Sequence, residues 1–194
     1  MSEPKDHWRV KAEQLRKKGK FEKSIKYFDK SIQIEKFDKT RKYWYYRGQN
    51  LISVRKFEEA IVCFDKELKL NKSNFDVLYH KGLAFFNLGK YVEAVECFNK
   101  AWEIKHAEFM KLNAQGETLK NYKKFEKALL YFDQANTIKP IQYDFWYHKG
   151  YALCEIGKYA EALDWYNEAL KMKPNDPKIV FEQSKCQMGL KNAS

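Results

Sequence analysis

The chain has 194 residues, of which 44% are hydrophobic and 16% aromatic, so it is long and apolar enough to bury a core, which excludes a disordered polypeptide. Only eight glycines and four prolines are present, which favours helices joined by short turns over a strand-rich fold. The formal net charge of +11 is concentrated at the N-terminus, where residues 1–42 hold 14 Lys and Arg against 7 Asp and Glu.

Membrane, metal and disulfide signals are weak. No run approaches the roughly 18 apolar residues of a membrane span, and the N-terminal MSEPKDHWRVK lacks the apolar core of a signal peptide, so we expect a cytoplasmic protein. No histidine lies at zinc-ligand spacing, so we expect no metal and no cofactor. The cysteines form no Cys-x-x-Cys pair, as expected of buried, unpaired thiols in a reducing compartment. They are Cys63, Cys97, Cys154 and Cys186.

A 34-residue pattern runs along the chain. The tetrapeptide Tyr-His-Lys-Gly begins at Tyr79 and again at Tyr147, which is twice 34 residues later, and a related stretch lies midway at 113–128. Numbering each repeat from 1 to 34 gives a frame in which equivalent residues can be compared. In chain order the five repeats cover residues 5–38, 41–74, 75–108, 109–142 and 143–176.

Large and small residues recur at fixed positions of the frame. Position 4 holds Trp8, Trp44, Leu78, Leu112 and Trp146, and position 8 holds Ala12, Gly48, Gly82, Gly116 and Gly150. Position 17 holds Phe21, Phe57, Tyr91, Phe125 and Tyr159, and position 20 holds Ser24, Ala60, Ala94, Ala128 and Ala162. Spacings of three and four predict two amphipathic helices in each repeat, which must stack on neighbouring repeats to bury their apolar faces.

The first repeats and the C-terminal end depart from this regularity. Lys39 and Thr40 fall outside the frame, which lengthens the first connection by two residues. Ser31 and Glu67 stand where later repeats have alanine, so the first two repeats should pack less tightly. Residues 177–190 are predicted to form a capping helix, which covers the apolar end of a stack of repeats.

This pattern of Trp, Gly, Tyr, Ala, Phe and Pro resembles the tetratricopeptide repeat over residues 5–176. The resemblance implies an all-α fold, a right-handed α-solenoid of antiparallel helix pairs forming one domain over 1–194. It also implies a concave groove lined by the first helix of each repeat. The chain has no phosphate-binding glycine loop, nucleophile elbow or His-Glu-x-x-His, so we expect no enzymatic activity.

The predicted function is an adaptor that binds a segment of another protein in this groove. An aromatic lining is expected to anchor the partner, and nearby polar side chains to bond its backbone. The aromatic residues are Tyr45, Tyr46, Tyr79, Phe86, Tyr147 and Tyr151, and the polar ones are Gln49, His80, Asn87, Asn113 and His148. Tyr79 and Tyr147 are alternatively duplicated scaffold residues. As groove residues, their removal should weaken binding but not folding, whereas a larger residue at Gly150 should disrupt helix packing.

The sequence bears on three other kinds of partner. The relatives that clamp acidic chaperone tails use Lys and Asn at positions 5 and 9, Asn at position 6, and Lys and Arg at positions 2 and 6 of successive repeats. Here those places hold Arg9, Glu13, Tyr46, Asp76 and His80, so a chaperone-tail clamp is disfavoured. RNA or another polyanion bound by the basic N-terminal repeat is an alternative. A third is a scaffold that self-associates, so that the chain is a monomer or a weak homo-oligomer.

Overall fold

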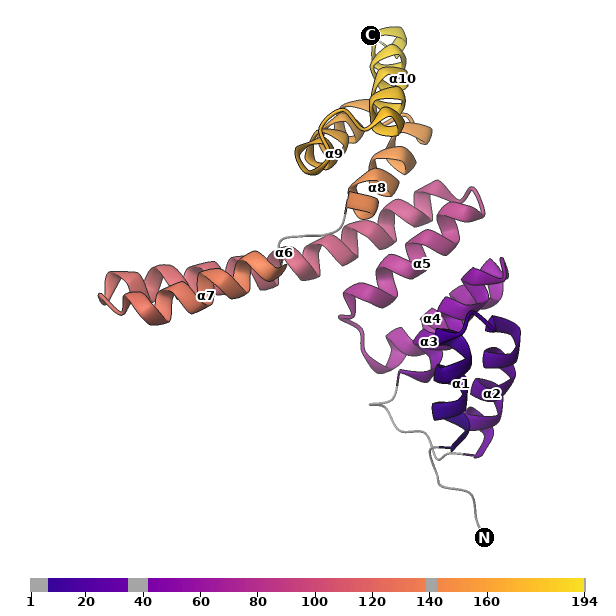
Figure 1. Cartoon of the computed structure of the whole chain (residues 1–194). Coiled ribbons are helices and arrows are strands. Elements are labelled where there is room, and N and C mark those ends of the chain that lie inside the picture. The colour runs from indigo at the N-terminus through magenta and orange to yellow at the C-terminus, as the bar shows by residue number, and fades with distance from the viewer. Residues whose placement is uncertain (1–6, 35–41, 139–142, 194) are drawn as a thin grey trace. The chain divides into compact units, whose positions relative to one another are not determined.

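The computed structural model describes residues 7–34, 42–138 and 143–193. Within this part the chain forms helices and no strand (Figure 1), which confirms the all-helical class. None of the described helices combines the length and apolarity needed to cross a membrane. The chain divides into two compact units, residues 1–89 and 90–194, which are described separately.

The first unit contains two helix pairs and the first helix of a third. Its two core clusters are centred on Phe28 and Phe64, both fully buried. The Cβ atom of any larger residue at Gly48 would lie 2.5 Å from the Phe64 ring, so position 8 is small because a helix packs there. The helices are α1 (His7–Lys17), α2 (Phe21–Ile34), α3 (Tyr43–Ser53), α4 (Phe57–Leu70) and α5 (Phe75–Asn87).

The turn inside each helix pair has one recurring conformation. Frame position 15 lies in the left-handed region, with φ of +69° at Gly19 and +61° at Arg55. This conformation ends a helix and suits glycine, whereas a residue with a side chain adopts it at a cost of about 1 kcal/mol. The five residues at this position are Gly19, Arg55, Gly89, Lys123 and Gly157.

The second unit contains a helix that the 34-residue frame does not predict. Helix α6 (Tyr91–Asn121) continues through the expected boundary between residues 108 and 109. Asn74 and Asp176, at position 34, cap the helices that follow them, whereas the third repeat has Glu108 there. Position 32 is Pro140 and Pro174 in the last two repeats but His106 in the third. Without a capping side chain or a proline, nothing ends the helix at this junction.

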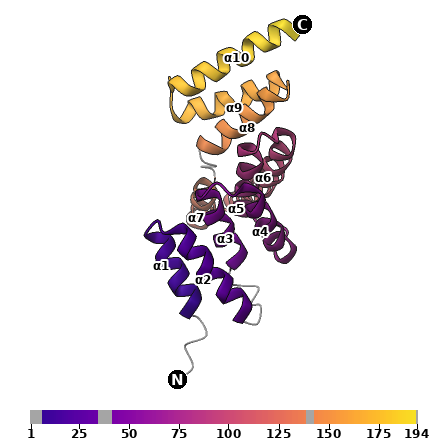
Figure 2. The same ribbon diagram turned by 90° about the vertical axis from the view of Figure 1, so that its right-hand side faces the viewer.

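The remaining helices of this unit pack on two halves of α6. Helix α7 (Phe125–Ile138) lies along the C-terminal half of α6 (Figure 1), and α8 (Tyr143–Glu155) packs on the N-terminal half. The ring of Phe145 lies 5.7 Å from that of Phe98. The fifth repeat therefore stacks directly on the third. Helices α9 (Tyr159–Met172) and α10 (Pro177–Ala193) follow α8 as successive layers (Figure 2).

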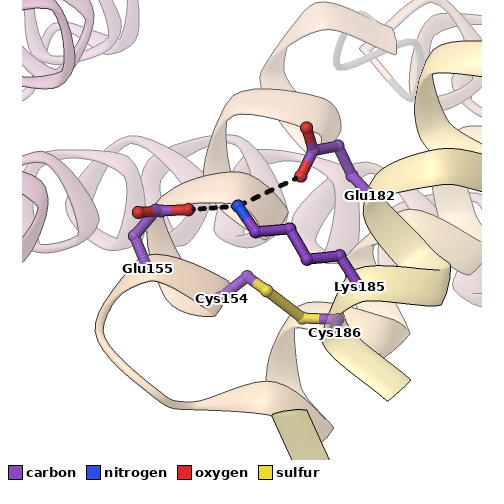
Figure 3. The surroundings of a disulfide bond; sticks show 5 residues. All are labelled: Cys154, Glu155, Glu182, Lys185 and Cys186. Atoms are coloured by element: carbon purple, nitrogen blue, oxygen red, sulfur yellow. Dashed lines mark hydrogen bonds and ion pairs between the residues drawn. A yellow bond between two sulfur atoms is a disulfide. The ribbon is translucent and has the colours of Figure 1, made fainter. Parts of the chain in front are cut away.

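Two cysteines expected to be unpaired form a disulfide, Cys154–Cys186 (Figure 3). Their Cα atoms are 5.9 Å apart, within the usual range for a disulfide. The expectation was wrong for this pair because α8 and α10, although 32 residues separate the two cysteines, are neighbours in the stack. Cys63 and Cys97 are buried thiols, as expected.

Candidate protein-binding site

In the first unit, α3 and α5 bring four predicted groove residues into one cluster, three of which are linked by hydrogen bonds. The Gln49 amide nitrogen donates to the Tyr45 hydroxyl at 2.8 Å and lies 3.1 Å from Nε2 of His80. The Tyr45 ring lies 5.4 Å from both the Tyr46 and the His80 rings. These side chains are half-buried, so their contacts fix their positions before any partner binds.

The hydrogen bonds of His80 define its protonation state. Nδ1 lies 2.7 Å from the Asp76 carbonyl oxygen, which can only accept, so Nδ1 carries the hydrogen. Nε2 then accepts from Gln49, and the ring is neutral. Burial, opposed by the Asp76 carbonyl and carboxylate, lowers the pKa of His80 below its usual value. Burial likewise raises the pKa of Tyr45, so its hydroxyl stays protonated.

The other predicted residues of this unit are spread along α5. Tyr79 is only 9% exposed, with Phe75 stacked on its ring at 6.0 Å. Phe86 is half-buried near the end of the helix. Asn87 is exposed, and its side chain donates to the Leu83 carbonyl oxygen of its own helix.

In the second unit, α8 supplies Tyr147, His148 and Tyr151. The Tyr147 ring lies 5.3 Å from the His148 ring and 6.2 Å from that of Tyr151. Lys178, from α10, places its ammonium 4.0 Å from the Tyr147 ring centroid, and only 7% of Tyr147 is exposed. This burial raises the pKa of Tyr147 to about 12. The capping helix therefore covers this ring.

Helix α10 also places charge beside the α8 aromatics. The Lys185 ammonium lies 2.9 Å from Glu155 and 3.9 Å from Glu182, next to the disulfide (Figure 3), and 5.6 Å from the Tyr151 ring centroid. The hydrogen bond to Glu155 raises the pKa of Lys185.

The structure corrects the expectation of an open aromatic lining. Tyr79 and Tyr147 are buried, because a neighbouring ring and the capping helix lie against them. Removal of these two rings should therefore lower stability, contrary to the sequence-based expectation. Asn113 is half-buried on α6, and the structure does not bring it together with either aromatic cluster through a described contact. The grouping of all these residues as one partner-binding groove stays a prediction.

Sequence reasoning also missed a set of polar contacts that link successive repeats. Position 7 of one repeat bonds to position 25 of the repeat before it. The Arg47 guanidinium lies 2.6 Å from the Asp29 carboxylate, and the Lys81 ammonium lies 2.6 Å from Asp65. In the capping helix, Gln183 donates to the Asn167 side-chain oxygen at 2.8 Å. A comparison of frame position 7 in each repeat with position 25 in the repeat before it would have predicted these contacts, because the two side chains match in type.

A cavity of about 700 Å³ lies among α6, α8 and α9. Trp102 and Trp165 form two of its walls, with ring planes at 81°, and the Trp146 indole nitrogen is buried with no hydrogen-bond partner among the described residues. The other lining residues are Lys105, His106, Phe109, Asp164, Asn167, Glu168 and Lys171. Two lysines balance two carboxylates, so the charge of this cavity does not select a ligand.

No cluster of three or more His, Cys, Asp or Glu side chains in the described residues could hold a metal ion.

Comparison with known families agrees with the helix-pair pattern. The tetratricopeptide repeat profile matches residues 11–38, 75–106 and 143–176. The chain is a tetratricopeptide-repeat protein with several repeats. No curated protein matches it.

Solved structures of the same fold share little sequence with this chain. The first TPR of Spaghetti (RPAP3) bound to the HSP90 peptide SRMEEVD is 19% identical, with coverage of 81% of this chain and 97% of that one, and a TM-score of 0.55. The second TPR domain of human RPAP3 in complex with an HSP70 peptide is 18% identical, with coverage of 74% and 92% and a TM-score of 0.50. MamA from Desulfovibrio magneticus RS-1 is 19% identical, with coverage of 91% and 98% and a TM-score of 0.52. At such identities the likeness concerns the fold.

Proposed function

We propose that this protein is a non-enzymatic adaptor that binds a segment of a partner protein through the first helices of its repeats. Tetratricopeptide repeats generally serve protein interaction rather than catalysis, and two similar structures hold a bound peptide. The observation that carries the proposal is the fixed network of Tyr45, Gln49 and His80, which links α3 to α5.

This network offers a peptide both apolar contact and hydrogen bonds. The Tyr45 hydroxyl accepts from Gln49, which leaves its own hydrogen to donate to a peptide carbonyl. The Arg16 guanidinium lies over one face of the neighbouring Tyr46 ring, 4.9 Å from the ring centroid. Because these groups are held in place by their contacts, a peptide would order few side chains on binding, which reduces the entropy cost.

The proposal does not extend to acidic chaperone tails. The two RPAP3 structures hold chaperone peptides that both end in EEVD, but that is a property of those proteins. In this chain, Glu13, Tyr46 and Asp76 stand at three places where the tail-clamping relatives carry Asn, Asn and Lys. Two carboxylates at these places would repel an acidic tail.

The test begins with capture of partners from the native cell and mapping of the bound region to a synthetic peptide. Titration of that peptide against Tyr46→Ala and Gln49→Ala should show binding weakened by about 1–2 kcal/mol for each variant, as is typical of interface anchors. Tyr122→Ala, which removes a tyrosine that is 73% exposed outside this network, is the matched control and should bind normally. Equal affinity of the Tyr46 variant and the control would refute the proposed site.

A further inference from the structure

The residue types at positions 7 and 25 match at every junction of the repeat frame, and three of these five junctions form the contact in the structure. A cation at position 7 meets a carboxylate at position 25 of the preceding repeat, as in Arg47–Asp29 and Lys81–Asp65. An amide at position 7 meets an amide, as in Gln183–Asn167. Two further pairs of matched type remain in the sequence, Gln115 with Asn99 and Lys149 with Asp133.

Neither of these two pairs forms in the structure, and both involve the fourth repeat. Asn99 and Gln115 lie on the same continuous helix, 16 residues or about 24 Å apart along its axis. Lys149 is only 4% exposed, and its ammonium lies 3.7 Å from the Trp165 ring centroid with no ion pair among the described residues. Asp133 is exposed on α7 and likewise has no ion pair there.

The fourth repeat also exposes apolar residues that its counterparts cover. At position 21, Leu129 is 59% exposed, whereas the residues of the other four repeats are half-buried or buried. At position 17, Phe125 is 63% exposed, whereas the other four aromatic residues are half-buried. The residues compared are Ile25, Ile61, Val95 and Leu163 at position 21, and Phe21, Phe57, Tyr91 and Tyr159 at position 17.

We propose that the exposed face of α7 is a docking surface for α8 of the same chain, so that the fourth repeat inserts between the third and the fifth. In this docked arrangement Lys149 pairs with Asp133 and Gln115 bonds to Asn99, which completes the contact at all five junctions. Leu129 and Phe125 become covered as their counterparts are. The helix that docks on this surface is α8, because α8 carries Lys149. Lys149 is the position-7 cation whose matching carboxylate, Asp133, forms no ion pair among the described residues.

The junction inside α6 allows both arrangements. Docking requires α6 to end near His106, where residues 106–108 are exposed. The described contacts across this point lie within α6 itself: the His106 ring stacks on that of Trp102 at 5.4 Å, and the Lys105 ammonium lies 3.1 Å from Glu108. Docking must therefore replace only local helix contacts. When the fourth repeat is undocked, the absence of a cap and a proline lets one helix run through, as the structure shows. The chain therefore has a two-state element in which helix continuity opposes repeat stacking.

A proline at the junction distinguishes the two arrangements. His106→Pro places proline at position 32, as in the fourth and fifth repeats, and would be tolerated when α6 ends there. The docked arrangement therefore predicts a melting temperature within a few degrees of the wild type. Glu117→Pro interrupts a helix in either arrangement and should melt much lower. Equal losses from both prolines would overturn the proposal.

A charge-reversal cycle tests the pair itself, on the monomeric fraction from gel filtration. Asp133→Lys and Lys149→Asp should each lower the melting temperature, and the double variant should recover part of the loss. The same cycle at Asp65 and Lys81, which are in contact, gives the size of coupling expected of a formed pair. Losses that simply add at Asp133 and Lys149, while the Asp65 and Lys81 cycle shows coupling, would overturn the proposal.

Discussion

The two copies of Tyr-His-Lys-Gly show how one tetrapeptide acquires two environments. In the first copy, Lys81 pairs with Asp65 at 2.6 Å. In the second, Lys149 is buried against the Trp165 ring, and this burial lowers its pKa to about 8. The tyrosines differ as well, because Phe75 of the same helix covers Tyr79 and the capping helix covers Tyr147.

The difference comes from the helix on which each copy is stacked. The first copy follows α4, which supplies the carboxylate at position 25, whereas the second is stacked on α6, where position 25 is Asn99. An identical local sequence therefore forms the same helix in both places, but the neighbouring element determines the charge, burial and exposure of its side chains. The following predictions test this contrast, from the largest expected effect to the smallest.

Replacement of either tyrosine tests whether the two rings are equivalent as core residues. Tyr79→Ala and Tyr147→Ala should each lower the free energy of unfolding by about 3 kcal/mol, because each removes a large buried side chain. Chemical denaturation measures both variants. Tyr122→Ala is the exposed control and should change stability by less than about 0.5 kcal/mol. A loss as small as that of the control would show that the rings lie open to solvent.

Removal of the disulfide tests what the capping helix contributes to the second copy. Cys154→Ser with Cys186→Ser should destabilise the second unit by about 2–4 kcal/mol, because the unfolded chain is no longer restrained by a bridge between residues 32 apart. A reductant should lower the melting temperature of the wild type and leave the double variant unchanged. An identical response of the two proteins to reductant would contradict the presence of the bridge.

Gly150→Leu tests the close helix contact that follows the second tetrapeptide. A Cβ atom there would lie 2.8 Å from the Tyr166 ring and 3.3 Å from the Ala162 carbonyl oxygen, so α8 and α9 must separate. We expect a loss of about 1–3 kcal/mol or more in thermal unfolding. Ala160→Leu adds a leucine at an exposed site of α9 and should be nearly neutral. Two variants of equal stability would show that this contact is loose.

Acidification tests the neutral His80 of the first copy. Because the pKa of His80 is lowered in the folded state, the unfolded chain binds a proton at a higher pH than the folded chain does. The contribution of His80 is therefore present above about pH 6.5 and lost as the pH falls below that value. Unfolding curves between pH 7 and 5 should show a smaller loss for His80→Gln than for the wild type. A parallel pH dependence would refute a neutral, buried ring.

The repeat pattern predicted the helices well because spacing alone defines an amphipathic helix. Small residues at position 8 correctly indicated close packing, as Gly48 and Gly150 show. The course of α6 was missed because a helix end depends on its cap, and the frame aligned Glu108 with Asn74 without weighing their different capping strengths. Exposure of the candidate site was misjudged for Tyr147, since its burial depends on Lys178, which is distant in sequence. It was misjudged for Tyr79 because the ring of Phe75, one turn earlier on the same helix, stacks on it.

The link between Cys154 and Cys186 bears on which part of α10 opens to solvent. The last helix of a stack has a neighbour on one side only, so it opens first and exchanges its amide hydrogens fastest. Cys186 lies near the middle of α10, and its bond to α8 restrains everything before it. We therefore expect transient opening of α10 to be confined to the residues after Cys186, so that their amide hydrogens exchange faster than those of residues 177–186.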